Sequence, residues 1–426
     1  MSTKKRLLTN FISLATMQGL NFILPLVSLP YLLTVVGPSK FGLISTAQAF
    51  IQYFILFTDY GFNLVATRDI SIARDNKKQL SIIFSTVMLI RLLLLAFSLL
   101  VLVIIVTFIP KFQHDSAIYY LTFGMVIGNV LFPIWFFQGM EHMKIISILN
   151  IISKSIFTIG IFVFVKGPTE YLNVAILNSL GYISIGLIGL FLVIYRYKIK
   201  MIKPSKEQIV HQLKEGWDIF VSNIVTSLYT NSNIFVLSFF ASNKIVGYYA
   251  SADKIIKAVS SVIGPLIQTV YPFLSRALQE SREKAISIIN KIFLMITASM
   301  GILALIVGLF AKQLVGFLGA KYIDSIPLLQ IMSVLPLILG WANVFGILTM
   351  INFDYKRQLS RIYIFASILS VILMSLLIPT FKEYGTAWNA VLTEGFATML
   401  MAIFLWKKEI HVWRRNRKKE FEYGRN

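Results

Sequence analysis

The sequence predicts an all-α polytopic membrane protein with about twelve transmembrane helices, arranged as two six-helix lobes around a central cavity. Of its 426 residues, 57% are hydrophobic and only 14% are charged, and the mean hydropathy is +0.75. Soluble domains carry about 25% charged residues, so this chain has too few to cover a water-facing surface. Apolar runs long enough to cross a bilayer core, about 20 residues each, recur along the whole chain.

The predicted spans alternate with short turns whose charge differs from one side to the other. Of the 40 Lys and Arg residues, 28 fall at the two ends and in the even-numbered turns, and 7 fall in the odd-numbered turns. This is the positive-inside pattern, and it predicts that both termini are cytoplasmic. The spans lie, to within a few residues, at 11–36, 42–66, 80–108, 117–139, 146–165, 170–194, 217–240, 247–272, 286–310, 323–350, 360–380 and 384–406.

The basic stretch 195–216 is the predicted boundary between the lobes. We assign 1–200 to an N-terminal lobe, and 201–426 to a C-terminal lobe that ends in a basic cytoplasmic tail. Apolar residues recur every four positions at Ile209, Leu213 and Trp217, a pattern typical of an amphipathic linker helix in the headgroup plane. An ordinary polar linker explains the stretch equally well. The apolar run after the basic N-terminus is too long for a signal-peptide core and predicts a retained first helix.

The two lobes are predicted to be repeats of one another. The segment 36–47 aligns with 241–252 at a constant offset of 205 residues, and Asp115-Ser116 before the fourth span matches Asp324-Ser325 before the tenth. Because each half begins on the cytoplasmic side, the repeat is parallel, with its axis along the membrane normal.

Polar residues recur at helical spacing in the first two spans of each lobe. A charge at mid-bilayer costs about 2.5–3.5 kcal/mol on the insertion scale, so these residues are expected to face a wet or protein interior. Hydrogen bonding between packed helices explains the isolated Ser and Thr residues without a cavity. The members that we place at the cavity are Gln48, Gln52, Asp59 and Asn63 in span two, Asn223 in span seven, and Asp253, Lys254 and Lys257 in span eight.

The charges within the spans predict a cavity that is net cationic. Asp253 can pair with Lys257 four residues later, which leaves Lys254 as surplus positive charge. Arg91 and Lys154 add positive charge from two other spans. Such a cavity favours an anionic, hydroxyl-rich solute, such as a sugar linked to pyrophosphate.

The head group of that solute is predicted to contact eight residues, and three carboxylates are candidates for proton or sodium coupling. A carboxylate in a low-dielectric site titrates closer to neutral pH, which suits it to coupling. For Asp59, a structural salt bridge to Arg68 or Arg91 is an equal alternative. The head-group residues are Lys254, Lys257, Arg91, Lys154, Gln48, Gln52, Asn63 and Asn223, and the coupling candidates are Asp59, Asp253 and Glu394.

Several other chemistries are excluded or disfavoured by what the sequence lacks. The chain has no cysteine, which excludes disulfides, thiol catalysis and cysteine metal sites. It has no G-x-x-x-x-G-K-[ST] loop and so carries no P-loop ATPase of its own. Its four histidines lack the spacing of zinc ligands, so no metal is predicted. The basic tail beside the last span is expected to rest on anionic lipid rather than on nucleic acid.

Three stretches resemble the Wzx-type polysaccharide repeat-unit flippases of the multidrug/oligosaccharidyl-lipid/polysaccharide exporter superfamily. They are Trp135–Met143 (WFFQGMEHM), Thr58–Asn63 (TDYGFN) with Arg68–Ser71 (RDIS), and Gly247–Lys257 (GYYASADKIIK). The resemblance covers essentially the whole chain. It implies a V-shaped pair of lobes whose cavity is lined by spans one, two, seven and eight.

The resemblance also implies a transporter rather than an enzyme. Such a protein moves an undecaprenyl-pyrophosphate-linked oligosaccharide across the bacterial inner membrane by alternating access, for O-antigen or capsule assembly. The head group enters the cavity while the polyprenyl tail stays in lipid. No cofactor is implied apart from H⁺ or Na⁺ coupling, and a polysaccharide polymerase and a chain-length regulator are the implied protein partners.

Three alternatives remain at this point. A drug or organic-cation exporter of the same superfamily needs a net acidic cavity, whereas span eight is net positive. A membrane polymerase or ligase of lipid-linked glycans is disfavoured, because no extracytoplasmic loop is long enough for a catalytic domain. A passive channel would have little reason for two bent lobes with buried ion pairs.

Overall fold

The computed structural model describes residues 3–410 and 412, and all the regular elements in that range are helices. This confirms the all-α prediction. Within the described range, nine helices are long and apolar enough to cross a membrane. The basic tail beyond 412 and His411 lie outside the described residues.

Two of the helices are much longer than one membrane crossing. Helix α1 (Thr3–Asp59) has 57 residues and α17 (Lys356–Lys407) has 52, and each contains one residue with non-helical backbone angles. These residues are Gly37 in α1 and Lys382 in α17. A bilayer core is about 30 Å thick, which one helix crosses in about 20 residues. Both helices are therefore two helices joined at a kink, and the count of twelve spans stays a prediction.

Contacts divide the chain into two compact units. Unit 1 comprises Met1–Ser227 and Ala241–Gly247, and unit 2 comprises Leu228–Phe240 and Tyr248–Asn426.

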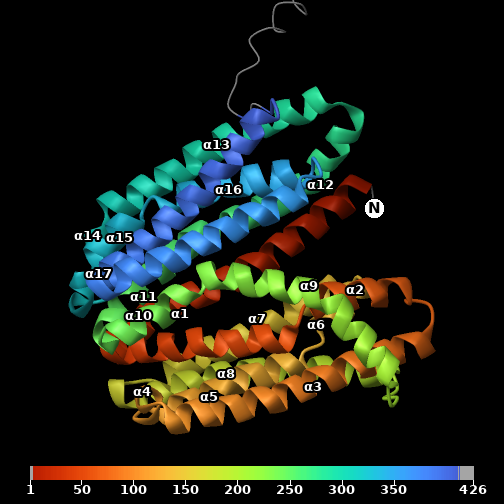
Figure 1. Cartoon of the computed structure of the whole chain (residues 1–426), viewed down its shortest axis with the longest axis horizontal. Helices are drawn as coiled ribbons and strands as arrows, with labels where there is room; N and C mark the ends of the chain where they lie inside the picture. Colours follow the sequence, from red (N-terminus) through yellow and green to blue (C-terminus); the bar gives the residue numbers. More distant parts are fainter. Residues whose placement is uncertain (1–2, 411, 413–426) are drawn as a thin grey trace, which may run out of the picture. The chain divides into compact units, whose positions relative to one another are not determined.

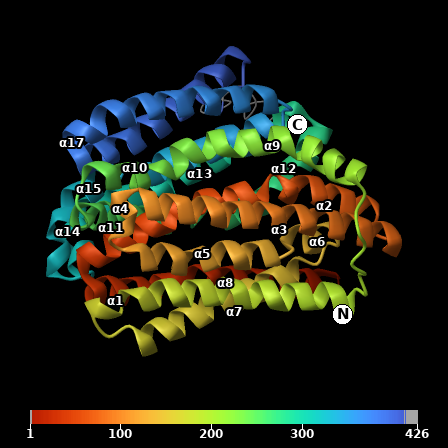
Figure 2. The same ribbon diagram turned by 60° about the horizontal axis from the view of Figure 1, so that its bottom comes forward.

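Unit 1 is built around α5 and α8, which pack along each other (Figures 1 and 2). Gly128 allows this close approach, because a Cβ there would lie 2.2 Å from the backbone of Tyr182. Its remaining core is rich in aromatic rings, among them Phe84 and Trp135. Its elements are α1, α2 (Phe62–Ile72), α3 (Lys77–Phe108), α4 (Pro110–Gln113), α5 (Ser116–Leu131), α6 (Ile134–Gly139), α7 (Met143–Phe164), η1 (Pro168–Glu170), α8 (Tyr171–Phe191), η2 (Leu192–Arg196) and most of α9 (Lys206–Thr230).

Unit 2 has a hydrophobic core to which α12, α13, η4 and α17 contribute. Ser281 caps α13 by accepting a hydrogen bond from the Lys284 amide at 3.2 Å. Its elements are α10 (Ser232–Phe240), most of α11 (Asn243–Ser260), α12 (Ile263–Glu280), α13 (Arg282–Leu309), α14 (Ala311–Gly316), η3 (Ala320–Ser325), α15 (Ile326–Met332), α16 (Leu335–Ala342), η4 (Asn343–Ile351) and α17.

One helix crossing in unit 1 follows the predicted repeat. A Cβ added at Gly42 would lie 1.8 Å from the carbonyl oxygen of Asn243, and one added at Gly247 would lie 2.0 Å from the carbonyl oxygen of Pro38. Gly42 and Gly247 differ by 205 positions, and so do Pro38 and Asn243. The α1 and α11 backbones therefore touch reciprocally through residues at equivalent places in the aligned segments 36–47 and 241–252.

Candidate functional site

A buried ion pair joins α1 to α3 in unit 1. The Arg91 Nη2 atom lies 2.8 Å from Asp59 Oδ1, and only 1% of the Arg91 side chain is exposed. Asn129 donates its amide to the same carboxylate oxygen at 3.0 Å, and Asn63 forms a further side-chain hydrogen bond to Asp59. The structure thus brings together three predicted site residues, Asp59, Asn63 and Arg91, and it realises the salt bridge that the sequence left as an alternative for Asp59.

The guanidinium of Arg91 is held by a break in the neighbouring helix. Helix α5 ends just before Phe132-Pro133, and proline has no N–H to donate to the carbonyl of Asn129. Arg91 Nη2 donates to that carbonyl at 3.0 Å, and Nη1 donates to the Phe132 carbonyl at 3.4 Å. The Arg91 donors therefore satisfy backbone acceptors as well as Asp59.

In unit 2, α11 carries the second predicted charge cluster. Lys257 Nζ lies 2.8 Å from Asp253 Oδ2, which realises the expected pair four residues apart. The Asp253 residue is buried, whereas Lys254 and Lys257 are exposed on the surface of their unit. Lys254 is the additional cation that the sequence predicts beside this pair.

A hydrogen-bonded group of neutral polar side chains lies inside unit 2, near this charge cluster. Asn389 in α17 donates to Asn233 Oδ1 at 2.7 Å and to Ser370 Oγ at 3.3 Å. Asn233 also hydrogen-bonds the side chain of Tyr249, one turn before Asp253 on α11. These buried hydrogen bonds connect α10, α11 and both halves of α17.

The other predicted residues differ in how far they are buried. Gln48, Lys154 and Glu394 are half-buried, whereas Gln52 and Asn223 are exposed. Within the described part of the chain, no group of three or more His, Cys, Asp and Glu side chains is arranged to hold a metal ion.

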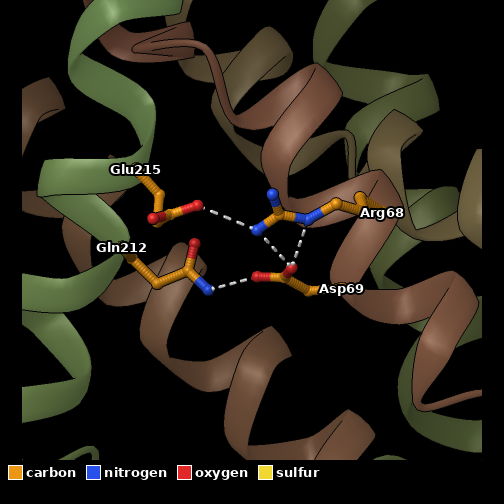
Figure 3. A network of polar contacts seen from close by, with 4 residues as sticks. All are labelled: Arg68, Asp69, Gln212 and Glu215. Atoms are coloured by element: carbon orange, nitrogen blue, oxygen red, sulfur yellow. Dashed lines mark hydrogen bonds and ion pairs between the residues drawn. The ribbon is translucent and has the colours of Figure 1, made fainter.

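A polar network that the sequence did not predict ties the start of α9 to the end of α2 (Figure 3). Arg68 lies 3.0 Å from Asp69 Oδ1 and 3.0 Å from Glu215 Oε2. Gln212 donates to Asp69 Oδ2 at 2.8 Å. Next to this network, Gly61 and Gly216 let the two segments approach closely, since a Cβ at Gly61 would lie 2.8 Å from the Gly216 carbonyl oxygen.

This network shows where the linker stretch lies in unit 1. Ile209 and Leu213, two residues of the predicted apolar stripe, pack on the core of unit 1, while Trp217 is 53% exposed. The linker therefore begins a helix at Lys206 whose apolar side contacts protein. The Arg68–Glu215 ion pair is exposed, and exposed ion pairs are worth about 0–1 kcal/mol. The buried Gln212 and the apolar residues therefore contribute more to holding α9 against α2.

Comparison with known proteins identifies one family. The family described as "Polysaccharide biosynthesis protein" matches residues 7–278. A protein of Escherichia coli (strain K12) named "Putative O-antigen transporter" is 32% identical over 405 residues, which cover 95% of this chain and 98% of that protein. A protein of Shigella dysenteriae with the same name is 29% identical over 93% of this chain and 98% of its own length.

Two solved structures exemplify the shared fold. An inward-facing multidrug resistance MATE family transporter of the MOP superfamily has a TM-score of 0.71 at 14% identity, covering 93% of this chain and 96% of its own. The lipid II flippase MurJ in an inward closed conformation also has a TM-score of 0.71, at 13% identity over 94% of this chain and 90% of its own. At these identities the likeness concerns the fold alone, and it agrees with the predicted polytopic architecture.

Proposed function

We propose, because the chain belongs to the polysaccharide biosynthesis protein family, that it is a flippase for lipid-linked oligosaccharide in the bacterial inner membrane. The observation that carries the proposal is the similarity to a relative named as an O-antigen transporter. The two chains are 32% identical, and the match covers 98% of the relative's length. A lipid II flippase has the same fold. The proposed cargo is an undecaprenyl-pyrophosphate-linked repeat unit, moved outward by alternating access, with both termini of the chain in the cytoplasm.

The charges on α11 support an anionic head group. Lys254 and Lys257 are exposed beside one buried carboxylate, Asp253, so the cluster is net positive. Lysine binds pyrophosphate as a point charge from a flexible side chain. We assign first contact with the pyrophosphate to these two lysines, and contact with the sugars to Gln48, Gln52, Asn63, Asn223 and Lys154. Arg91, the remaining predicted head-group residue, is engaged inside its unit by Asp59 and two carbonyls.

Among the three carboxylates proposed for H⁺ or Na⁺ coupling, Glu394 fits proton transfer best. Asp59 and Asp253 each lie within 2.8 Å of a cationic nitrogen. Glu394 is half-buried on α17 and has no ion-pair partner among the described residues. A carboxylate without a compensating cation in a low-dielectric site takes up a proton more readily than a paired one.

The function is tested in a deletion strain that still makes the glycan. Cells without the protein are expected to accumulate unprocessed single repeat units on the cytoplasmic leaflet, and the chain is expected to restore surface polysaccharide. The leaflet is read by labelling intact cells and inverted vesicles with a membrane-impermeant glycan reagent. Accumulation of single repeats on the outer leaflet would assign polymerisation rather than transport to the chain.

Replacing Lys254 and Lys257 together by alanine is expected to lower surface polysaccharide at least about tenfold at normal protein level, because each charge-assisted contact is worth about 1.5–3 kcal/mol. Quantitative immunoblots of glycan and protein measure this. Lys291→Ala is the matched control, since it removes an exposed lysine from another helix of unit 2. A wild-type amount of surface polysaccharide in the double variant would show that these lysines do not bind the transported head group.

A further inference from the structure

A cavity of about 490 Å³ lies in unit 1, beside the polar network of Figure 3. Its walls come from the end of α2, the first part of α3 and the start of α9. These segments flank turns in which basic residues concentrate, which predicts that the cavity opens at the cytoplasmic leaflet.

The polar wall of the cavity is acidic. Asp69 and Glu207 both line it, and its described lining residues include no lysine or arginine and one histidine, His211. Asp69 is also paired with Arg68 at 3.0 Å, so Glu207 supplies the negative charge of this wall that is not ion-paired within the described residues. This sets the cavity apart from the predominantly basic turns around it. A ligand that is drawn to this wall carries positive charge rather than the negative charge expected of the proposed cargo.

One buried acceptor in the wall lacks a hydrogen-bond donor. Gln212 lines the cavity and is only 6% exposed. Its Nε2 donates to Asp69 at 2.8 Å, but its Oε1 has no hydrogen-bond partner anywhere in residues 3–410 and 412. Leaving a buried amide oxygen unpaired is costly, so a ligand with N–H donors is favoured here over one that carries charge alone.

Part of the cavity lining is apolar. Ile72, Ile82 and Ile83 form this part, and 79% of Ile72 is exposed although the residue lies at the end of a helix in a membrane protein. An exposed isoleucine at the lipid–water interface is stabilised by contact with hydrocarbon. The ligand therefore combines a cationic N–H donor with an apolar body.

We propose that this cavity binds an amine-headed phospholipid of the cytoplasmic leaflet, with phosphatidylethanolamine as the lipid that fits. Its ammonium group has three N–H donors for Gln212, Asp69 and Glu207, and its glycerol and acyl carbons lie against the isoleucines. Phosphatidylcholine has the same charge but no N–H donor, and phosphatidylglycerol is an anion. Because α2, α3 and α9 all contribute walls, the bound lipid holds the start of α9 against α2 and α3.

The test compares three lipids with identical acyl chains. The purified full-length protein is given phosphatidylethanolamine, phosphatidylcholine or phosphatidylglycerol in turn. Native mass spectrometry measures how much of each lipid is retained, and the thermal unfolding midpoint of the protein is measured with each lipid. Retention of phosphatidylethanolamine is expected to exceed that of phosphatidylcholine by about fivefold or more, with the higher midpoint. Equal retention of these two lipids, or preference for phosphatidylglycerol, overturns the proposal.

Two variants test whether the preference for phosphatidylethanolamine over phosphatidylcholine arises at this cavity. Glu207→Gln removes a charge from an exposed side chain of the cavity wall without changing its size, so the protein is expected to fold and to lose most of the preference. Glu215→Gln is the matched control, because Glu215 lies on the same helix but does not line the cavity. A Glu207→Gln protein that keeps the full preference contradicts the assignment, as does a Glu215→Gln protein that loses it.

Discussion

Alanine at Gly42 is expected to destabilise the folded protein by at least about 1–3 kcal/mol, the usual range for overpacking, and alanine at Gly247 by a similar amount. A new Cβ at either position would lie 2.0 Å or less from a backbone carbonyl oxygen of the facing segment. Neither carbonyl is the end of a flexible side chain, so the helices themselves must move apart. The thermal unfolding midpoint of the purified protein measures the loss.

Gly301→Ala is the matched control for both variants. Gly301 lies within the helix α13, and nothing lies within 4 Å of a Cβ added there. Alanine is the better helix former, so this change is expected to be neutral or slightly stabilising. If Gly42→Ala and Gly247→Ala leave the midpoint unchanged, the close crossing of α1 and α11 does not exist in the folded protein.

This crossing shows how far sequence alone reaches. Hydropathy and charge alternation predicted the helical membrane class, because both follow from composition along the chain. The offset of 205 residues predicted which segments correspond, and Gly42 and Gly247 indeed occupy reciprocal places. The sequence did not predict that the two segments touch. An alignment of repeats shows which residues are equivalent, but it does not show how far apart they lie in space.

The candidate site was predictable only in part, although the Asp59–Arg91 ion pair was one of the two salt bridges that the sequence offered for Asp59. Helical spacing placed Asp59 with Asn63 and Asp253 with Lys257, since each pair lies four residues apart. Asn129 and Asn389 were missed, because they reach their partners from other helices. One signal was available for Asn129: Pro133 lies four residues later and frees a carbonyl inside a predicted span.

Arg91→Met is expected to cost about 3–5 kcal/mol, because it breaks a buried ion pair and leaves one partner charged. The Asp59 carboxylate would keep only the Asn129 and Asn63 amides, and the Asn129 carbonyl would keep only the Phe132 N–H as a donor, at 3.2 Å. Replacing both charges, as Asp59→Leu with Arg91→Met, is expected to restore most of this stability, since apolar pairs often replace buried ion pairs at little cost. Thermal unfolding of the two single variants and the double variant gives the coupling energy.

The double variant also separates the two roles considered for Asp59. An ion-coupling carboxylate is needed for transport even in a stable protein, whereas a carboxylate that serves only to neutralise Arg91 is dispensable once Arg91 is gone. Because Asp59 Oδ1 is held by both Arg91 and Asn129, we expect the stable double variant to restore surface polysaccharide in the deletion strain. A double variant that unfolds at the wild-type temperature yet carries no glycan would instead assign coupling to Asp59, and Glu394→Gln would then be expected to transport normally.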